Sequence, residues 1–425
     1  MGKDIASLIN EAEKNQEKQT PDIWIRNGNG KIKQNSPTNV VLFLSNSRLF
    51  QKAIKLNAFT EEVEISTIKE ELIDIQEGPL EEKYYTDIKM YAERKLGVTF
   101  TEDALYQGVE KVARSNQYNP IIDYMDSAYK SWDRKERLKS IFCDFLGAEE
   151  NETTFLITRL FFLGAVAKAY NPKVNFDYCL DLVGSQGVGK TLFLKQIAPL
   201  GYYTDAFSSF SDKDDIARMA RSFIVNDDEM TATKNTSFEE LKKFISLTKI
   251  MYRPPYGRKD ISKDKKFVFA RTTNDLYHLK DITGDRRYLP IRCHFETKMK
   301  VAEKLNPESV LQYWGEAVHL YKENPESMRP LNEEENKLLI DQREKFRFTD
   351  EIDDDLFELM NNDFKDREFI PSYEINGRIN PHKFRSVANK VKNIMTNTYG
   401  YKANVAKKVE GRTVKGYLRM QNKET

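Results

Sequence analysis

Apolar and polar residues follow two different patterns along the chain. In the first part, apolar residues recur at helical spacing, which indicates amphipathic helices. These helices are predicted at residues 85–97, 101–115, 120–145 and 152–170. From residue 177 onward, short apolar runs alternate with helical stretches, as in an α/β core built on a parallel sheet. The strands of this core are predicted at residues 178–183, 221–225, 266–271 and 287–291.

This pattern divides the chain into four predicted parts. Residues 1–150 are expected to form a mostly helical accessory domain, and residues 151–330 an α/β nucleotide-binding core. Residues 331–364 are predicted to be a linker, because they are polar and strongly acidic. Residues 365–425 are predicted to form a separate basic domain, called the tail below.

The charge distribution predicts that the tail binds nucleic acid. The whole chain holds 67 Lys and Arg against 66 Asp and Glu, so its net charge of +1 favours no partner. Locally, residues 331–364 hold 12 acidic and 4 basic side chains. Residues 365–425 hold 14 basic and 5 acidic side chains. An acidic segment before a basic module is typical of a linker followed by a nucleic-acid-binding domain.

The tail pattern resembles a winged helix. A helix is predicted at residues 381–398, and two strands follow at residues 401–409 and 413–418. In winged-helix domains the helix and the hairpin commonly contact duplex DNA. The hairpin residues expected to contact DNA are Lys407, Lys408, Arg412 and Lys415. The alternative is that these charges only make the surface soluble.

The most specific motif follows the first predicted strand of the core. Residues 184–191 match the pattern G-x-x-x-x-G-K-[ST] at every fixed position, and a helical pattern follows. Such a loop directs backbone N–H groups and a helix N-terminus at phosphate oxygens. Lys190 can reach the β- and γ-phosphates, and the Thr191 hydroxyl can ligate Mg²⁺. The residues predicted to bind ATP with Mg²⁺ are Gly184, Ser185, Gln186, Gly187, Val188, Gly189, Lys190 and Thr191.

Two acidic residues follow the second predicted strand. Asp228 and Glu229 occupy the place where P-loop enzymes hold one acid for Mg²⁺ and one carboxylate beside the attacking water. Asp227 is an alternative metal partner, because the register is open by one residue. A solvated acidic loop is the non-functional alternative. The sequence therefore predicts a catalytic role for this pair and a metal-binding role for Asp228 together with Thr191.

Three further residues are candidates for catalysis. Asn274 ends the third strand, where its amide can bond the water or the γ-phosphate; an ordinary turn Asn is the alternative. Arg286 and Arg287 follow a turn, and either can stabilise transition-state charge as an arginine finger across a subunit interface. A salt-bridged pair at the start of a strand is the other interpretation of these arginines.

A basic and aromatic segment lies between the second and third strands. Residues 251–266, MYRPPYGRKDISKDKK, interleave tyrosines with positive charge around a Pro-Pro turn. This composition suits a hairpin that contacts a single-stranded backbone, although a charge run is often only a solvated face. Ring helicases place their pore hairpin directly before the strand that ends in the Asn. The residues expected to contact DNA here are Arg253, Tyr256, Arg258 and Lys259.

The cysteines and the lengths of the apolar segments predict where in the cell the chain is located. Cys143, Cys179 and Cys293 form no C-x-x-C pair, which disfavours a disulfide framework and a zinc site. The sequence shows no secretory signal pattern and no apolar run approaching the roughly 20 residues that a membrane span needs. We therefore expect a soluble cytoplasmic protein without a membrane partner.

Taken in order, these motifs resemble the virulence-associated E family. The resemblance is carried by NPIIDYMDSAYKSWDRKERLKSIFCDFLG, GSQGVGKT, NDDEM, YRPPYGR, ARTTN and TGDRRYLP, and it spans residues 119 to about 321. The family is similar to superfamily 3 helicases and occurs in phages, prophages and phage satellites. It implies a sensor role for Asn274, a finger role for Arg286 rather than Arg287, and pore-hairpin roles for Arg253, Tyr256 and Arg258. The implied location is the bacterial host cytoplasm.

The chain departs from this family in two respects. Many members have Glu at the position of Asn226, so any role of that acid is in doubt here. Relatives are often fused to a primase-polymerase domain, but no acidic polymerase motif stands before residue 150. A primase partner would therefore be a separate chain.

Together these features predict an AAA+-like P-loop NTPase core between a mostly helical N-terminal domain and a winged-helix-like tail. The expected function is that of an ATP-dependent replicative DNA helicase of a phage or mobile element. It would form a homo-oligomeric ring, expected to be a hexamer, and translocate on single-stranded DNA, with duplex or origin DNA on the tail. The alternatives are a replication initiator that melts an origin with the same motor, a P-loop enzyme such as a kinase, and a regulator with a vestigial site.

Overall fold

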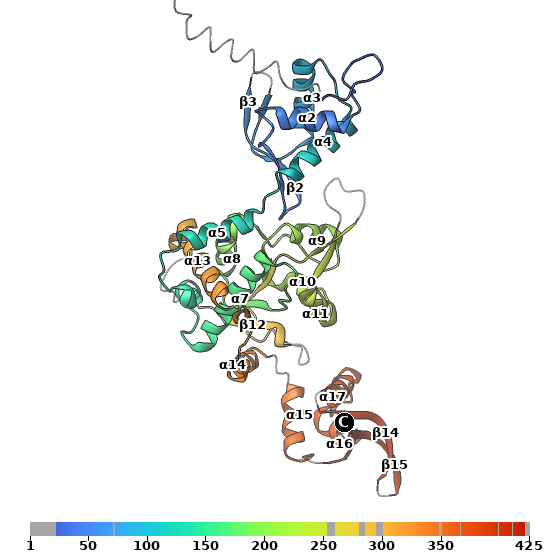
Figure 1. Cartoon of the computed structure of the whole chain (residues 1–425). Helices are drawn as coiled ribbons and strands as arrows, with labels where there is room; N and C mark the ends of the chain where they lie inside the picture. The colour runs from blue at the N-terminus through green and yellow to red at the C-terminus, as the bar shows by residue number, and fades with distance from the viewer. Residues whose placement is uncertain are drawn as a thin grey trace, which may run out of the picture. The chain divides into compact units, whose positions relative to one another are not determined.

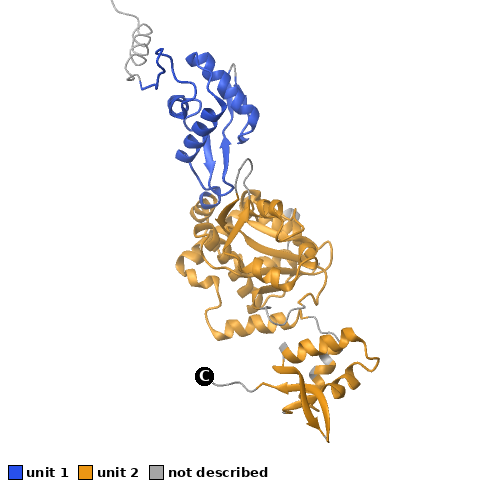
Figure 2. Cartoon of the chain, turned by 90° about the vertical axis from the view of Figure 1, so that its right-hand side faces the viewer, with its two compact units in different colours: residues 1–123 blue, residues 124–425 orange. Residues whose placement is uncertain are grey.

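The computed structural model describes residues 23–70, 73–252, 260–279, 285–294, 301–347, 351–365, 367–397, 399–409 and 411–420. The chain forms two compact units, residues 1–123 and 124–425 (Figure 2). The predicted boundary near residue 150 is therefore displaced. Residues after 123 belong with the second unit because they are bonded to it: the N–H groups of Arg137 and Leu138 donate to the Glu316 carboxylate at 2.7 and 2.9 Å.

The first unit combines helices with small antiparallel sheets (Figure 1). Its helices are α2 (Pro37–Asn46), α3 (Glu82–Leu96) and α4 (Glu102–Ser115). Its strands are β1 (Ile54–Asn57), β2 (Glu62–Ile65), β3 (Ile68–Glu70), β4 (Ile73–Ile75) and β5 (Gly78–Pro79), with sheet orders β1-β2-β5 and β3-β4. The unit is thus α+β rather than mostly helical. Strands of two to four residues are too short for an alternating pattern to be recognised in sequence.

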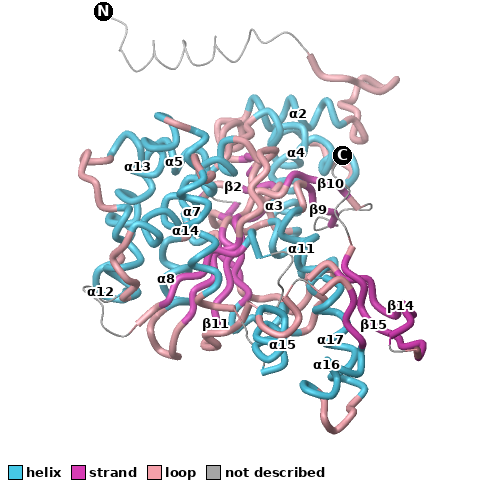
Figure 3. Tube along the Cα trace, turned by 90° about the horizontal axis from the view of Figure 1, so that it is seen from below, coloured by secondary structure: helices cyan, strands magenta, loops and turns pink. Residues whose placement is uncertain are grey.

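A five-stranded parallel sheet lies at the centre of the second unit, with strand order β12-β6-β11-β8-β7 (Figure 3). The strands are β6 (Cys179–Val183), β7 (Tyr203–Thr204), β8 (Ile224–Asp227), β11 (Val268–Thr273) and β12 (Tyr288–Arg292). The four predicted strands are confirmed, although β8 begins three residues later than expected. Since all neighbouring strands are parallel, their carboxyl ends meet at one edge of the sheet.

Helices cover both faces of this sheet. On one face, α7 (Glu152–Tyr170) packs on β11 and β12 and against α13 (Pro307–Glu323). On the other face, Val225 and Phe269 share a buried cluster with Met219 and Phe244. The last two residues belong to α9 (Lys213–Ala220) and α11 (Phe238–Ser246). The remaining short elements are α5 (Pro120–Ser131), η1 (Leu138–Ser140), α6 (Ile141–Leu146), α8 (Lys190–Ile197), η2 (Pro199–Gly201), η3 (Asp228–Met230), α10 (Thr231–Lys234), β9 (Lys249–Tyr252), β10 (Ile261–Asp264), η4 (Asp285–Arg287), α12 (Val301–Lys304) and η5 (Pro325–Met328).

Helix α7 is long and apolar enough to cross a membrane by length and composition alone, since it has 19 residues. It is the one such helix among the described residues, and 83% of its apolar window is buried inside the structure. Arg159 and Lys168 interrupt this helix, so it is not a continuous apolar run of about 20 residues. The burial of α7 is that of a core helix, whose apolar side chains pack against the sheet and against α13 and η5.

The acidic segment 331–364 is not an unstructured linker. Two helices occupy it, α14 (Glu333–Glu344) and α15 (Glu351–Asn361). Glu335 of α14 accepts two hydrogen bonds from Arg159 of α7, at 2.7 and 2.9 Å, and Gln342 donates to the Pro290 carbonyl at 3.0 Å. The prediction failed because one face of α14, which includes Glu335, Leu339 and Gln342, packs on the core, whereas the other acidic residues of this helix are exposed.

The tail packs together with α15 around one buried cluster. After α15 the chain forms β13 (Phe369–Pro371), α16 (Ser372–Ile379), α17 (Arg385–Asn397), β14 (Tyr401–Val409) and β15 (Arg412–Arg419). The strands make an antiparallel sheet in the order β13-β15-β14. Leu356 and Phe364 share a buried cluster with Val391 of α17 and Tyr417 of β15. The predicted helix and hairpin are confirmed, whereas β13 and α16 were not anticipated.

Candidate functional site

The glycine-rich segment 184–191 turns at the carboxyl end of β6 and leads into α8. Gly189 caps α8 with a φ of 96°, in the left-handed region that L residues rarely adopt. Gly184 lies so close to the next strand that a Cβ there would be 2.3 Å from the Cys293 carbonyl oxygen. The Gly184 N–H donates to the Thr273 carbonyl at 3.0 Å. The loop is thus held against the ends of β11 and β12.

Lys190 bends back over this loop. Its side-chain ammonium donates to the carbonyl oxygens of Gly184 at 2.6 Å and Ser185 at 3.0 Å, and the residue is only 5% exposed. A cavity of roughly 330 Å³ opens beside it. The cavity is lined by Gln186, Gly187, Gly189, Lys190, Thr191, Asp228 and Glu229. Residues predicted separately from the loop and from the acidic pair therefore line the same cavity.

The Asp228 carboxylate faces Thr191. Its Oδ1 atom accepts from the Thr191 hydroxyl at 2.6 Å and from the Thr272 hydroxyl at 2.7 Å. The Asn226 amide also approaches this oxygen, at 3.4 Å. Carboxylate and hydroxyl oxygens beside a phosphate-binding loop are the ligands that Mg²⁺ prefers. The residues present therefore fit a Mg²⁺ ion held between Thr191, Asp228 and the phosphates.

The hydrogen bonds of Asp227 show which of the two neighbouring aspartates faces the loop. Its carboxylate accepts from the N–H groups of Ala232 and Thr233, both at 2.8 Å, and from the Thr233 hydroxyl at 2.6 Å. It is 1% exposed and points into the turn that leads to α10. Asp227 therefore organises the backbone, and Asp228 is the acid that faces the loop.

Glu229 has an unusual backbone conformation. Its φ is 52° and its ψ is 22°, and the next residue, Met230, also has a φ of 52°. Consecutive left-handed residues other than glycine are strained, and they persist only where surrounding contacts hold them. One such contact is the Glu229 N–H, which donates to the Thr272 hydroxyl at 3.0 Å. This conformation holds Glu229 at the edge of the loop cavity.

Of the remaining predicted catalytic residues, Asn274 lies at the same edge of the sheet as the loop, whereas Arg286 and Arg287 precede β12 and lie at the opposite, amino edge. Asn274 is exposed and directly follows β11, whose last carbonyl, that of Thr273, bonds the phosphate loop. Arg287 is half-buried, and its Nε donates to the Ser246 hydroxyl at 2.8 Å. Arg286 is exposed, and its carbonyl accepts from Arg343 at 3.5 Å. Of the two arginines, only Arg286 presents an exposed guanidinium.

The proposed pore hairpin is described only at its base. Strands β9 and β10 pair antiparallel, whereas Arg253, Tyr256, Arg258 and Lys259 lie outside the described residues. The base is anchored by Lys265, which is 2% exposed and donates to the Ile245 carbonyl at the end of α11 at 2.5 Å. Burial, together with the nearby charge of Lys168, lowers the pKa of Lys265 to about 7.

The basic side chains predicted in the tail lie on one hairpin. All four are exposed on β14 and β15: Lys407, Lys408, Arg412 and Lys415. Lys408 is paired with Thr413 in the strand register, and Ala406 is paired with Lys415. Lys407 lies 4.0 Å from the Glu368 carboxylate and above the Phe369 ring. In this register Lys407 and Arg412 lie on one face of the hairpin, and Lys408 and Lys415 lie on the other.

The chain was compared with known proteins. A model of the virulence-associated protein E-like domain matches residues 125–348, more than half of the chain. The chain belongs to this family. No curated protein matches it significantly. Two apo structures of the NrS-1 C-terminal region are similar at 14% identity, with TM-scores of 0.45 and 0.43; each alignment covers 91% of this chain and 100% of the other chain. No residue role is transferred at this level of similarity.

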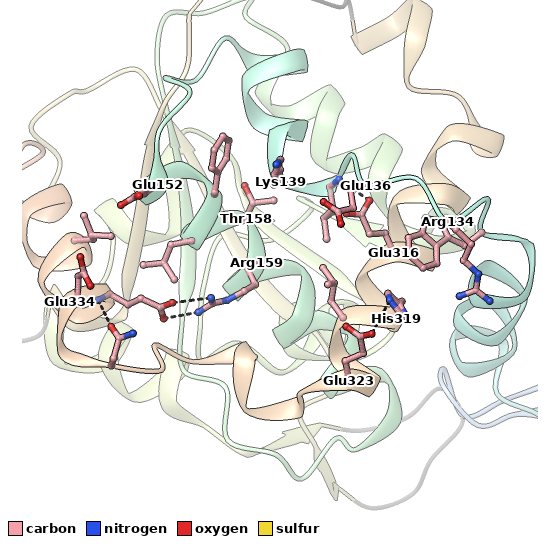
Figure 4. Close-up of a pocket in the computed structure, with 18 residues that line it drawn as sticks. Arg134, Glu136, Lys139, Glu152, Thr158, Arg159, Glu316, His319, Glu323 and Glu334 are labelled. Atoms are coloured by element: carbon pink, nitrogen blue, oxygen red, sulfur yellow. Dashed lines mark hydrogen bonds and ion pairs between the residues drawn. The ribbon is translucent and has the colours of Figure 1, made fainter.

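The virulence-associated E-like domain contains a second cavity, of roughly 840 Å³, between η1, α7, α13 and α14 (Figure 4). It shares no lining residue with the loop cavity. Arg159 in its lining pairs with Glu335, and the Glu316 carboxylate accepts from the backbone N–H groups of Arg137 and Leu138. Burial raises the pKa of Glu316, and the two N–H groups oppose that effect. We find in this cavity no convergent set of groups aimed at a ligand.

Sequence reasoning missed a buried ionic cluster in the virulence-associated E-like domain. Asp181 of β6 accepts two bonds from Arg271 of β11, at 2.8 and 2.6 Å, and lies 2.8 Å from His278 Nε2. All three side chains are at most 3% exposed. Burial would raise the pKa of Asp181, but the charge of Arg271 and the bond from His278 outweigh it and hold that pKa below its usual value. The sequence holds one indication of this cluster: each of the two apolar strand segments, CLDLV and FVFARTT, contains one charged residue, and the two charges are opposite.

Proposed function

We propose that the chain is an ATP-dependent DNA helicase that forms a ring, expected to be a hexamer, and moves along single-stranded DNA during replication of a phage or mobile element. The observation that carries this proposal is the meeting of Lys190, Thr191, Asp228 and Glu229 in one cavity at the carboxyl edge of a parallel sheet. Membership of the virulence-associated E-like family supports it. A P-loop NTPase core of AAA+ type is the fold that we propose for residues 125–348.

The reaction would be hydrolysis of ATP by in-line attack of water on the γ-phosphate. The loop N–H groups and Lys190 would bind the β- and γ-phosphates, while Thr191 and Asp228 would hold Mg²⁺. That ion neutralises phosphate charge when it is bound. Glu229 would orient the attacking water and accept its proton, because its carboxylate borders the same cavity. Asn274 would hold the water or the γ-phosphate by its amide.

Arg286 would complete the site of a neighbouring subunit. Transition-state charge on the γ-phosphate requires a cation, and an arginine finger in trans is the usual source. Arg287 is bonded to Ser246 of its own subunit, whereas the Arg286 guanidinium is exposed. Such an arrangement is possible only in an oligomer with head-to-tail interfaces, as in a closed ring.

The first experiment measures ATP hydrolysis with and without single-stranded DNA, together with native mass with and without nucleotide. A helicase should be stimulated by single-stranded DNA and should assemble into a ring. An ordinary P-loop enzyme such as a kinase would show neither effect. Hydrolysis at full rate by a strictly monomeric protein, indifferent to DNA, would contradict the proposal.

A replication initiator is the second candidate, and the tail favours it. Its order of helix, strand, two helices and two strands supports a winged-helix domain, and the β14–β15 hairpin exposes basic side chains. In an initiator the tail would recognise origin DNA while the motor melts it. A primase would then act as a separate partner chain.

The tail prediction concerns salt dependence. Replacing Lys407, Lys408, Arg412 and Lys415 together by Ala should weaken duplex binding and flatten the slope of log K against log salt by about 3 to 4, at roughly 0.9 per lost phosphate contact. Basal ATPase should persist, and Lys111→Ala on α4 serves as a control from the first unit. Preference for origin DNA over a scrambled duplex would indicate an initiator. If the slope of log K against log salt is unchanged, then these four side chains of the hairpin do not contact DNA phosphates.

A further inference from the structure

Thr272 joins the two acids of the loop cavity through one hydroxyl group. It lies near the end of β11, is 0% exposed, and stands opposite Leu182 of β6 in the strand register. Its hydroxyl donates to Asp228 Oδ1 at 2.7 Å and accepts the Glu229 N–H at 3.0 Å. A single side chain is therefore bonded to the carboxylate of one acid and to the backbone of the other.

These bonds act where the backbone is strained. Glu229 and Met230 both have left-handed conformations, with φ of 52° at each. The turn that follows is held by Asp227, which bonds Ala232 and Thr233, and the Glu229 N–H is bonded to Thr272. Strain of this kind is retained only while the surrounding contacts oppose relaxation. Without the Thr272 hydroxyl, the half-buried Glu229 N–H loses its hydrogen-bond acceptor.

We infer that Thr272 is the positioning residue that holds Asp228 and Glu229 in their productive geometry. The inference rests on the proposed ATPase function and adds a residue to its machinery. Thr272 does not line the loop cavity, so it acts through the two acids. A displacement of about 1 Å at a reacting group can lower a rate about 10²-fold, and loss of an outer hydrogen bond to a metal ligand commonly lowers activity about 10- to 100-fold.

The test is Thr272→Val, which keeps the shape of the side chain and removes the hydroxyl. The kcat of ATP hydrolysis should fall about 10- to 100-fold, while affinity for a fluorescent ATP analogue changes little, because the loop itself is untouched. Thr272→Ser keeps the hydroxyl and should recover most of the kcat. Thr158→Val is the matched control: Thr158 is also 0% exposed, but its hydroxyl donates to the Thr154 carbonyl of its own helix, away from the loop cavity.

A double-mutant comparison separates positioning from simple destabilisation. If Thr272 acts through Glu229, Thr272→Val should add little to the loss already caused by Glu229→Gln, since residues that act as a unit are strongly non-additive. Should Thr272→Val fail to fold, Thr272→Ala carries the same test, with thermal unfolding measured beside each kcat. The inference is overturned if both Thr272→Val and Thr272→Ala keep the wild-type kcat. It is also overturned if the losses in kcat caused by Thr272→Val and Glu229→Gln add fully in the double mutant. Either result leaves the ATPase proposal intact. A wild-type chain without ATPase activity overturns both.

Discussion

A Lys190→Ala chain and an Arg286→Ala chain, each inactive alone, are expected to recover ATPase activity when mixed. Lys190 binds phosphates in its own subunit, and removing its charge should abolish hydrolysis. Arg286 is expected to act on the neighbouring subunit, and loss of an arginine finger typically lowers kcat about 10³- to 10⁵-fold. In a randomly mixed ring, roughly a quarter of the interfaces would combine an intact loop with an intact finger.

The measurement is ATPase activity at fixed total protein concentration and varied mixing ratio. Activity should be largest near equal amounts of the two variants and should vanish at either end. Arg287→Ala is the matched control, because Arg287 is the neighbouring arginine and is bonded to Ser246 within its own subunit. If ATPase activity does not recover at any mixing ratio, then Arg286 acts within its own subunit or is not an arginine finger. Recovery with Arg287→Ala instead of Arg286→Ala would reverse the assignment.

The second large effect is expected in stability, at the Asp181–Arg271–His278 cluster. Asp181→Leu alone should lower the free energy of unfolding by about 3–5 kcal/mol, because it leaves the Arg271 charge buried without its carboxylate. Asp181→Leu combined with Arg271→Met should recover much of that loss, since a buried ion pair often contributes little over apolar groups of similar volume. Denaturant unfolding at neutral pH measures both variants beside the wild-type chain.

An exposed pair provides the control. Glu344→Gln breaks the pair with Arg347, whose side chains are 49% and 28% exposed, and should cost less than about 1 kcal/mol. The folded pKa of Asp181 is depressed, so its contribution to stability is fully present above the unfolded pKa of about 3.9 and is lost as pH falls toward the folded value. A cost for Asp181→Leu no larger than that of Glu344→Gln would contradict the buried-charge argument.

Local chemistry explains which elements the sequence predicted well. Gly184, Lys190 and Thr191 stand in a contiguous motif whose spacing is set by the geometry of one turn, so no knowledge of distant contacts is needed. Strands β6, β8, β11 and β12 are buried on both faces and appear as apolar runs. Helix α4 was recognisable for the same reason: Thr101 accepts from the Ala104 N–H at its start, and its apolar residues recur at helical spacing.

The mistakes share another cause. Residues 331–364 were predicted to be a linker because acidic composition does not reveal that one face of α14 packs on the core. The strands of the first unit were missed because two to four residues hold too little pattern. In each case the deciding contacts lie far away in sequence.

The sequence by itself therefore determined that the chain carries a glycine-rich loop with the phosphate-binding pattern, an acidic pair after a buried strand and a basic tail, because each is a local pattern of residue types. Only the tertiary structure decided that Asp228 rather than Asp227 faces Thr191, since the choice depends on which carboxylate bonds the following turn. It also decided that Thr272 bonds both acids and that Arg271 neutralises Asp181. These pairs meet because β11 lies between β6 and β8, and strand order is set by long-range packing that no local pattern records.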